Sequence, residues 1–127
     1  MGVDGRLNGR RVLVVEDEAM IAALIEMTLR EAGCSVVGPI AGAGHALAAI
    51  ERESFDAVVL DICDGDSRSY PLADALLARG VPFLFVSGLA CRDMPADYRA
   101  CPYVTKPFTP DALISALDRT ISRPRAS

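Results

Sequence analysis

Acidic residues follow two apolar runs of this chain. Asp61 comes directly after Ala-Val-Val-Leu at 57–60, and the pair Glu16 and Asp17 comes after Val-Leu-Val-Val at 12–15. Such runs lack the alternation of a half-exposed strand and are typical of strands buried on both faces of a parallel sheet. In open sheets of this kind, functional groups gather beyond the carboxyl ends of the strands. We therefore expect the three carboxylates to lie close together.

A cluster of three carboxylates is expected to bind a cation. Neighbouring negative charges repel one another and raise the pKa values of the acids unless a cation lies between them. A small set of oxygen ligands favours Mg²⁺, which keeps several of its waters and shares an oxygen with a phosphoryl group. The sequence therefore predicts that Asp17 and Asp61 bind Mg²⁺, with Glu16 binding through a water molecule.

Two further polar side chains are expected at the same edge of the sheet. Ser87 follows the apolar run 81–86, and Lys106, the only lysine among 13 basic residues, follows the short run 103–105. A compact ammonium and a hydroxyl donor both suit the oxygens of a phosphoryl group. A carboxylate that attacks phosphorus needs such neutralisation of charge, and the remaining work is positioning. We infer that Asp61 accepts a phosphoryl group, with Lys106 and Ser87 beside it.

Apolar runs alternate with amphipathic segments along the chain. The expected strands are 10–16, 34–40, 55–61, 81–86 and 103–105, and the expected helices are 18–32, 43–53, 71–79 and 110–122. This order predicts an α/β fold, a doubly wound five-stranded parallel sheet of (βα)5 type. The segment 89–100 has no sustained helical period and contains Pro95, so we expect a loop with at most one or two helical turns.

Capping and turn residues set the expected helix ends. Asp17 is expected to cap the first helix, with Glu18 in its first turn, where a negative charge suits the helix dipole. Gly33 is expected to end that helix. Pro71 is expected as the first residue of the third helix, and Thr109 as the cap of the last.

Length and composition limit the classes of function. The 127 residues with 24% charged side chains suit one domain, which we place at residues 10–122 with flexible ends at 1–9 and 123–127. The net charge is −4 and no dense Lys/Arg cluster is present, which disfavours binding to nucleic acid. No signal peptide and no apolar run of bilayer length is found, and the four cysteines form no C-x-x-C pair. We expect a cytoplasmic protein with reduced thiols, without membrane contact.

Four motifs in order along the chain carry a family resemblance. They are Val-Leu-Val-Val-Glu-Asp-Glu at 12–18, Val-Val-Leu-Asp at 58–61, Phe-Val-Ser-Gly at 85–88 and Lys-Pro-Phe at 106–108. Together they resemble the receiver domain of two-component response regulators, over residues from about 10 to 122. The resemblance implies a flavodoxin-like sheet with strand order 2-1-3-4-5.

The same resemblance implies roles for individual residues. It implies an acidic pair at Glu16 and Asp17, a phosphoacceptor at Asp61, a switch hydroxyl at Ser87 and a phosphate-facing Lys106. It further implies that the backbone carbonyl of Cys63 binds the metal and that Tyr103 is the aromatic residue that rotates inward on phosphorylation. The Lys106–Pro107 bond is often cis in such proteins.

Two features depart from the common receiver pattern. Position 65 is Gly, where receivers commonly carry Pro four residues after the acceptor. The motif Phe-Val-Ser-Gly followed by the irregular segment 89–100 is similar to a subgroup named for a Phe-Ala-Thr-Gly motif, whose fourth helix is degraded. The usual output surface around that helix is therefore open to question in this chain.

The resemblance leads to a single-domain response regulator. We expect it to take a phosphoryl group from a sensor histidine kinase or a histidine phosphotransfer protein, and to act on an unknown downstream protein by contact or to serve as a phosphate sink. We expect no enzyme activity beyond Mg²⁺-dependent self-phosphorylation and self-dephosphorylation, and a monomer or weak dimer. We expect no output domain, because few residues lie outside 10–122.

Two alternatives stay open. One is a pseudo-receiver, a binding module that signals without phosphorylation. The other is a small hydrolase of the aspartyl-phosphate type, which the chain disfavours because it has no cap domain and no second carboxylate two residues after Asp61. A dinucleotide site at Gly42-Ala-Gly44 is disfavoured because Leu47 stands where a third small residue belongs.

Overall fold

The computed structural model describes residues 7–62, 69–87 and 101–122. Five strands and four helices alternate in this part of the chain. They are β1 (Arg11–Val15), α1 (Ala19–Glu31), β2 (Ser35–Ile40), α2 (Ala43–Arg52), β3 (Ala57–Ile62), α3 (Ser69–Arg79), β4 (Phe83–Ser87), β5 (Tyr103–Thr105) and α4 (Pro110–Ser122). The strands are all parallel and lie in the order β2-β1-β3-β4-β5. The predicted fold class and strand order are confirmed.

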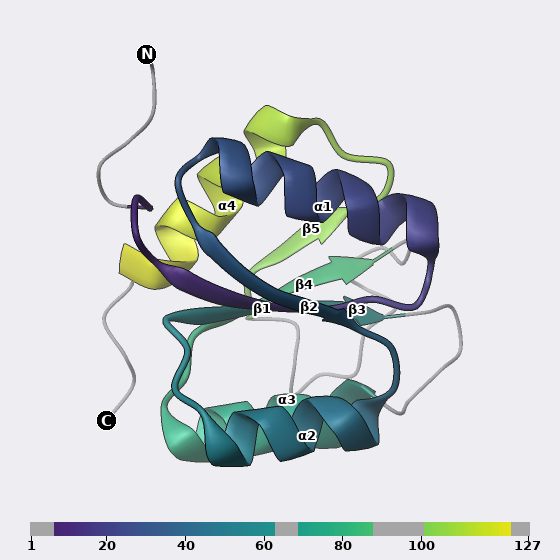
Figure 1. Ribbon diagram of the computed structural model, residues 1–127, viewed down its shortest axis with the longest axis vertical. Helices are drawn as coiled ribbons and strands as arrows, with labels where there is room; N and C mark the ends of the chain where they lie inside the picture. The colour runs from purple at the N-terminus through teal and green to yellow at the C-terminus, as the bar shows by residue number, and fades with distance from the viewer. Residues whose placement is uncertain (1–6, 63–68, 88–100, 123–127) are drawn as a thin grey trace.

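The sheet is covered by helices on both faces, with α1 and α4 on one and α2 and α3 on the other (Figure 1). Successive residues of a strand point to opposite faces. Accordingly Val12 and Val14 of β1 belong to the core cluster that includes residues of α1 and α4, whereas Leu13 and Val15 belong to the cluster that includes residues of α2 and α3. This two-sided burial is why β1 reads as a continuous apolar run.

Some of the helix ends lie where the sequence predicts them, and others do not. Thr109 caps α4 as predicted, because its Oγ1 accepts a hydrogen bond from the backbone N–H of Ala112 at 3.1 Å. The prediction that Asp17 caps α1 is wrong: Glu18 occupies the N-cap position and makes no side-chain capping bond. The predicted start of the third helix at Pro71 is also wrong, since α3 begins at Ser69. Pro71 still lies in its first turn, where no intrahelical partner is needed for an N–H.

Residues before the predicted start of the domain contribute to its core. Leu7 is fully buried and belongs to the cluster that contains Val12 and Leu29. The backbone N–H of Gly9 donates to the carbonyl of Gly33 at 2.8 Å. Gly33 has a φ of 93°, the left-handed conformation that lets a glycine end α1. Packing therefore extends to residue 7, whereas the sequence placed the start of the domain at residue 10.

Two predictions concern residues between the described ranges. Cys63 and the segment 89–100 both lie outside the described residues. The Lys106–Pro107 bond is cis, as the family resemblance implied.

No helix in the described part of the chain combines the length and apolar character needed to cross a bilayer.

Candidate functional site

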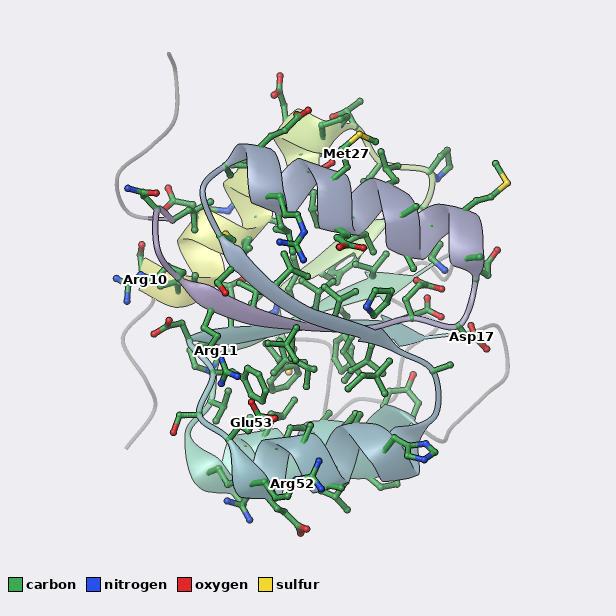
Figure 2. The ribbon with its side chains drawn as sticks, viewed as in Figure 1. Arg10, Arg11, Asp17, Met27, Arg52 and Glu53 are labelled. Atoms are coloured by element: carbon green, nitrogen blue, oxygen red, sulfur yellow. The ribbon has the colours of Figure 1, made fainter. Side chains whose placement is uncertain are left out.

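The acidic residues of β1 and β3 are brought together by strand register. Val15 of β1 pairs with Leu60 of β3, so the next residue of each strand, Glu16 or Asp61, lies at the same level of the sheet. Asp17 follows in the link to α1 and lies at the opposite end of the sheet from Arg10 and Arg11 (Figure 2). Carboxylate oxygens of Glu16, Asp17 and Asp61 all lie within 4.8 Å of one another. The predicted acidic cluster is present.

The three carboxylates differ in burial. Asp17 is exposed, whereas the side chain of Glu16 is 0% exposed and that of Asp61 is 6% exposed. Burial raises the pKa of Glu16 from 4.5 to about 7, and the negative charge of Asp61 adds to the rise. A hydrogen bond from the backbone N–H of Glu18 to Glu16 Oε2, at 3.1 Å, and the positive charge of Lys106 lower the pKa but do not cancel the effect. Glu16 therefore holds a proton more tightly than a glutamate in water does, and it would lose this proton when a cation binds.

Lys106 brings a positive charge to this cluster from the far side of β4. It follows β5, and β4 lies between β5 and β3, so its side chain reaches over the end of β4. Its Nζ lies 2.5 Å from Asp61 Oδ1, 3.1 Å from Glu18 Oε1 and 3.7 Å from Glu16 Oε1. Burial lowers the pKa of Lys106, but these carboxylates outweigh burial and raise it above the usual value for lysine. The side chain therefore stays an ammonium at physiological pH.

The remaining predicted site residues are placed only in part. Ser87 ends β4, where its backbone pairs with Ile62 on one side and Thr105 on the other, the chain neighbours of Asp61 and Lys106. Tyr103 of β5 is half-buried and packs against the core cluster on the α2 and α3 face. The metal-binding carbonyl expected at Cys63 lies outside the described residues.

The contact between Glu18 and Lys106 was missed by the sequence analysis. Glu18 was assigned only a helix-dipole role in the first turn of α1. The available signal was a third acid directly after Glu16 and Asp17, one more than capping a single helix requires.

The donor set fits a magnesium ion. Glu16 Oε1 is buried and has no hydrogen-bond partner among the described residues. The Lys106 ammonium lies 3.7 Å from this oxygen, too far for a hydrogen bond. A buried oxygen without a hydrogen bond is costly, and a bound cation would satisfy it. Glu16, Asp17 and Asp61 supply only oxygen ligands, which is the set that Mg²⁺ prefers. These three residues would hold the ion.

Comparison with known proteins agrees with this geometry. The family model of the response regulator receiver domain matches residues 12–118. The chain belongs to the response regulator receiver domain family. Members of this family are the receiver modules of two-component systems.

Three relatives illustrate the similarity. The transcriptional regulatory protein TcrA of Mycobacterium tuberculosis is 37% identical over 94% of this chain and 48% of its own length. The BeF3-activated conformation of SdrG from Pseudomonas melonis Fr1 is 37% identical, with a TM-score of 0.73 over 84% of this chain and 92% of that one. The receiver domain of the sensor histidine kinase PA1611 from Pseudomonas aeruginosa PAO1 is 27% identical, with a TM-score of 0.69 over 91% and 99%.

Two properties of the relatives bear on this chain. The chain spans about half the length of the curated relatives that it matches first. The PA1611 receiver domain contains a magnesium ion coordinated in its active site cleft.

Proposed function

We propose that this receiver domain accepts a phosphoryl group on Asp61 from the phosphohistidine of a sensor histidine kinase or a histidine phosphotransfer protein. The phosphorylated domain then acts on a downstream protein by direct contact, or serves as a sink for phosphoryl groups. Glu16, Asp17 and Asp61 would hold Mg²⁺, which would supply positive charge for the transfer. Membership of the receiver family and the magnesium-bound relative support this proposal.

The observation that carries the proposal is the position of Lys106. Its ammonium lies 2.5 Å from Asp61 Oδ1, at an acidic cluster formed by Glu16, Asp17 and Asp61. A nucleophilic carboxylate is repelled by an anionic phosphoryl donor, so a fixed positive charge at the reacting atom lowers the barrier. Because its pKa is raised, Lys106 carries that charge throughout the reaction.

The proposed transfer is balanced without any further reactant. A carboxylate oxygen of Asp61 forms a bond to phosphorus as the phosphorus–nitrogen bond of the donor breaks. The electron pair stays on that nitrogen, and the donor leaves as neutral imidazole when its other nitrogen carries the proton. Bound Mg²⁺ would supply positive charge facing the oxygens of the transferred group.

Three further residues have proposed parts in this reaction and its readout. Ser87 lies one residue beyond the position of β4 that pairs with Asp61. Its hydroxyl would donate a hydrogen bond to a phosphoryl oxygen. The carbonyl of Cys63 would complete the metal ligands. Tyr103, on the neighbouring strand to Ser87, would turn inward when that hydroxyl engages the phosphoryl group. The order β3-β4-β5 makes this coupling possible, since β4 contacts both other strands.

Mass spectrometry after incubation with acetyl phosphate and Mg²⁺ tests the proposal. We expect a gain of one phosphoryl group that Asp61→Asn abolishes and that EDTA prevents. Asp111→Asn is the matched control, because Asp111 is an exposed aspartate in the first turn of α4. The absence of any gain in the wild type would overturn the proposal in favour of a module that signals without phosphorylation. Turnover of many equivalents would favour a hydrolase instead.

A further inference from the structure

The ammonium of Lys106 contacts one carboxylate that lies outside the metal-binding cluster. Besides Asp61 and Glu16, its Nζ contacts Glu18 Oε1 at 3.1 Å, with the geometry of a hydrogen bond. Glu18 is not among the residues whose oxygens converge as possible metal ligands. Its side chain therefore contacts the site through Lys106.

Glu18 is held in place by its backbone. It is the N-cap residue of α1, with an extended conformation, and its N–H donates to Glu16 Oε2 at 3.1 Å. Glu18 therefore connects Glu16 to Lys106. Its backbone N–H is hydrogen-bonded to the Glu16 carboxylate, and its side chain accepts a hydrogen bond from the Lys106 ammonium. The hydrogen bond to Glu16 keeps the Glu18 backbone beside the site, within reach of Lys106.

The partners of Lys106 differ in how easily they can be exchanged. An ammonium has three N–H donors, and three carboxylates lie near it in this structure. The side chains of Glu16 and Asp61 are 0% and 6% exposed, whereas that of Glu18 is 60% exposed. A buried carboxylate that loses its cation pays a desolvation cost, but an exposed one is solvated by water at once. Glu18 is therefore the partner that an arriving phosphoryl oxygen can displace most easily.

We propose that Glu18 is a positioning residue that holds Lys106 in the unphosphorylated site and competes with the phosphoryl group for its ammonium. This inference rests on the proposed function of Asp61. The Glu18 carboxylate also adds an exposed negative charge 3.1 Å from the ammonium that an anionic donor would contact. Both effects act in the same direction, and they slow the phosphorylation of Asp61.

The rate of phosphorylation by excess acetyl phosphate at saturating Mg²⁺ tests this role. In this reaction a bond forms from Asp61 to phosphorus, the bond from phosphorus to the acyl oxygen breaks, and acetate leaves with the electron pair. We expect Glu18→Gln and Glu18→Ala to be phosphorylated roughly twofold to tenfold faster than the wild type, the range set by removal of an exposed ionic contact and of a charge near the donor. Glu18→Asp should restore a rate close to that of the wild type.

Salt dependence separates this role from a purely structural one. The screening length falls from about 30 Å at 0.01 M salt to about 3 Å at 1 M. The rate advantage of Glu18→Gln should therefore shrink as salt is added, which a general loosening of the fold would not produce. Glu26→Gln is the matched control, because Glu26 lies on the same helix and pairs with Arg30 rather than with the site. It should match the wild type at every salt concentration.

The possible outcomes distinguish the two proposals. If the wild type is phosphorylated on Asp61 but Glu18→Gln and Glu18→Ala are no faster, the role of Glu18 is refuted and the proposed function stands. A rate advantage for Glu18→Gln that does not change with salt also refutes competition for charge. If the wild type takes up no phosphoryl group, the proposed function fails and this inference fails with it.

Discussion

Replacing Glu16 with glutamine should make the metal-free protein more stable at alkaline pH. The wild-type side chain is fully buried next to Asp61, and burial raises the pKa of Glu16 from 4.5 to about 7. Glutamine has nearly the same shape and no charge to desolvate. The size of the effect follows from the difference between the pKa of Glu16 in the folded protein and its pKa in the unfolded chain. Each unit of that difference is worth about 1.4 kcal/mol.

The direction of the pH dependence follows from proton binding. Below pH 4.5 the carboxyl group is protonated in both the folded and the unfolded state, so its ionisation costs the fold nothing. Between pH 4.5 and about 7 the folded state holds its proton more tightly than the unfolded state. The free energy of unfolding therefore falls as pH rises through this range, and above pH 7 the loss reaches about 3 kcal/mol.

Urea denaturation in the presence of EDTA measures this effect. We expect the advantage of Glu16→Gln over the wild type to grow by about 2.5 kcal/mol between pH 5 and pH 8, most of the full value. Glu51→Gln is the matched control, because Glu51 is an exposed glutamate on α2, on the other face of the sheet from α1. An advantage that stays constant with pH, or shrinks as pH rises, would refute the reasoning that burial of this carboxylate dominates its pKa.

Three further predictions concern the same site and the core. Mg²⁺ affinity measured by isothermal titration calorimetry should rise about tenfold from pH 6 to pH 8, because the ion must displace a proton from Glu16, whose pKa is about 7; Glu16→Gln should abolish most of this dependence. Lys106→Met should slow phosphorylation by acetyl phosphate about a hundredfold or more, as expected when a charge that faces the reacting group is removed; a rate within a few-fold of the wild type would contradict the role given to the ammonium. Leu7→Ala should lower the free energy of unfolding by about 2 to 5 kcal/mol, because it leaves a cavity in the core. Leu77→Ala is the control: its side chain is exposed, so the change should be less than about 1 kcal/mol. Equal losses for the two variants in urea denaturation would contradict the burial of Leu7.

Much of the site could be predicted because it depends on the order of the strands. The apolar runs that end at residues 15 and 60 identify two buried strands, and parallel strands end at one edge of their sheet. Residues that follow these strands must then be neighbours, whatever the details of packing. The proximity of Glu16, Asp17 and Asp61 follows from this rule, and the structure confirms it. Lys106 follows β5 at the same edge and reaches Asp61 past the end of β4.

The errors have a common cause in contacts that leave no periodic signal. Leu7 is a lone apolar residue in a polar stretch, so nothing in the local pattern shows that it fills a place in the core. By residue type Asp17 is a better cap than Glu18, since Asp but not Glu is among the residues preferred at that position. The choice between them depends on the hydrogen bond from the Glu18 N–H to the Glu16 carboxylate, which only the folded turn brings into reach.

The sequence by itself determined which elements form and which functional groups stand at the edge of the sheet, and the resemblance of its motifs to the receiver family supplied the order of the strands. The elements and the edge residues depend on local pattern and on the rules of parallel sheets, which act on every chain alike. Only the tertiary structure decided how the charges share their partners. The contact between Glu18 and Lys106 joins residues 88 positions apart, and the burial that separates Glu16 from Glu18 depends on helices and strands packed from both sides. Neither distance nor burial can be read from residue types, because both arise from the summed packing of the whole domain.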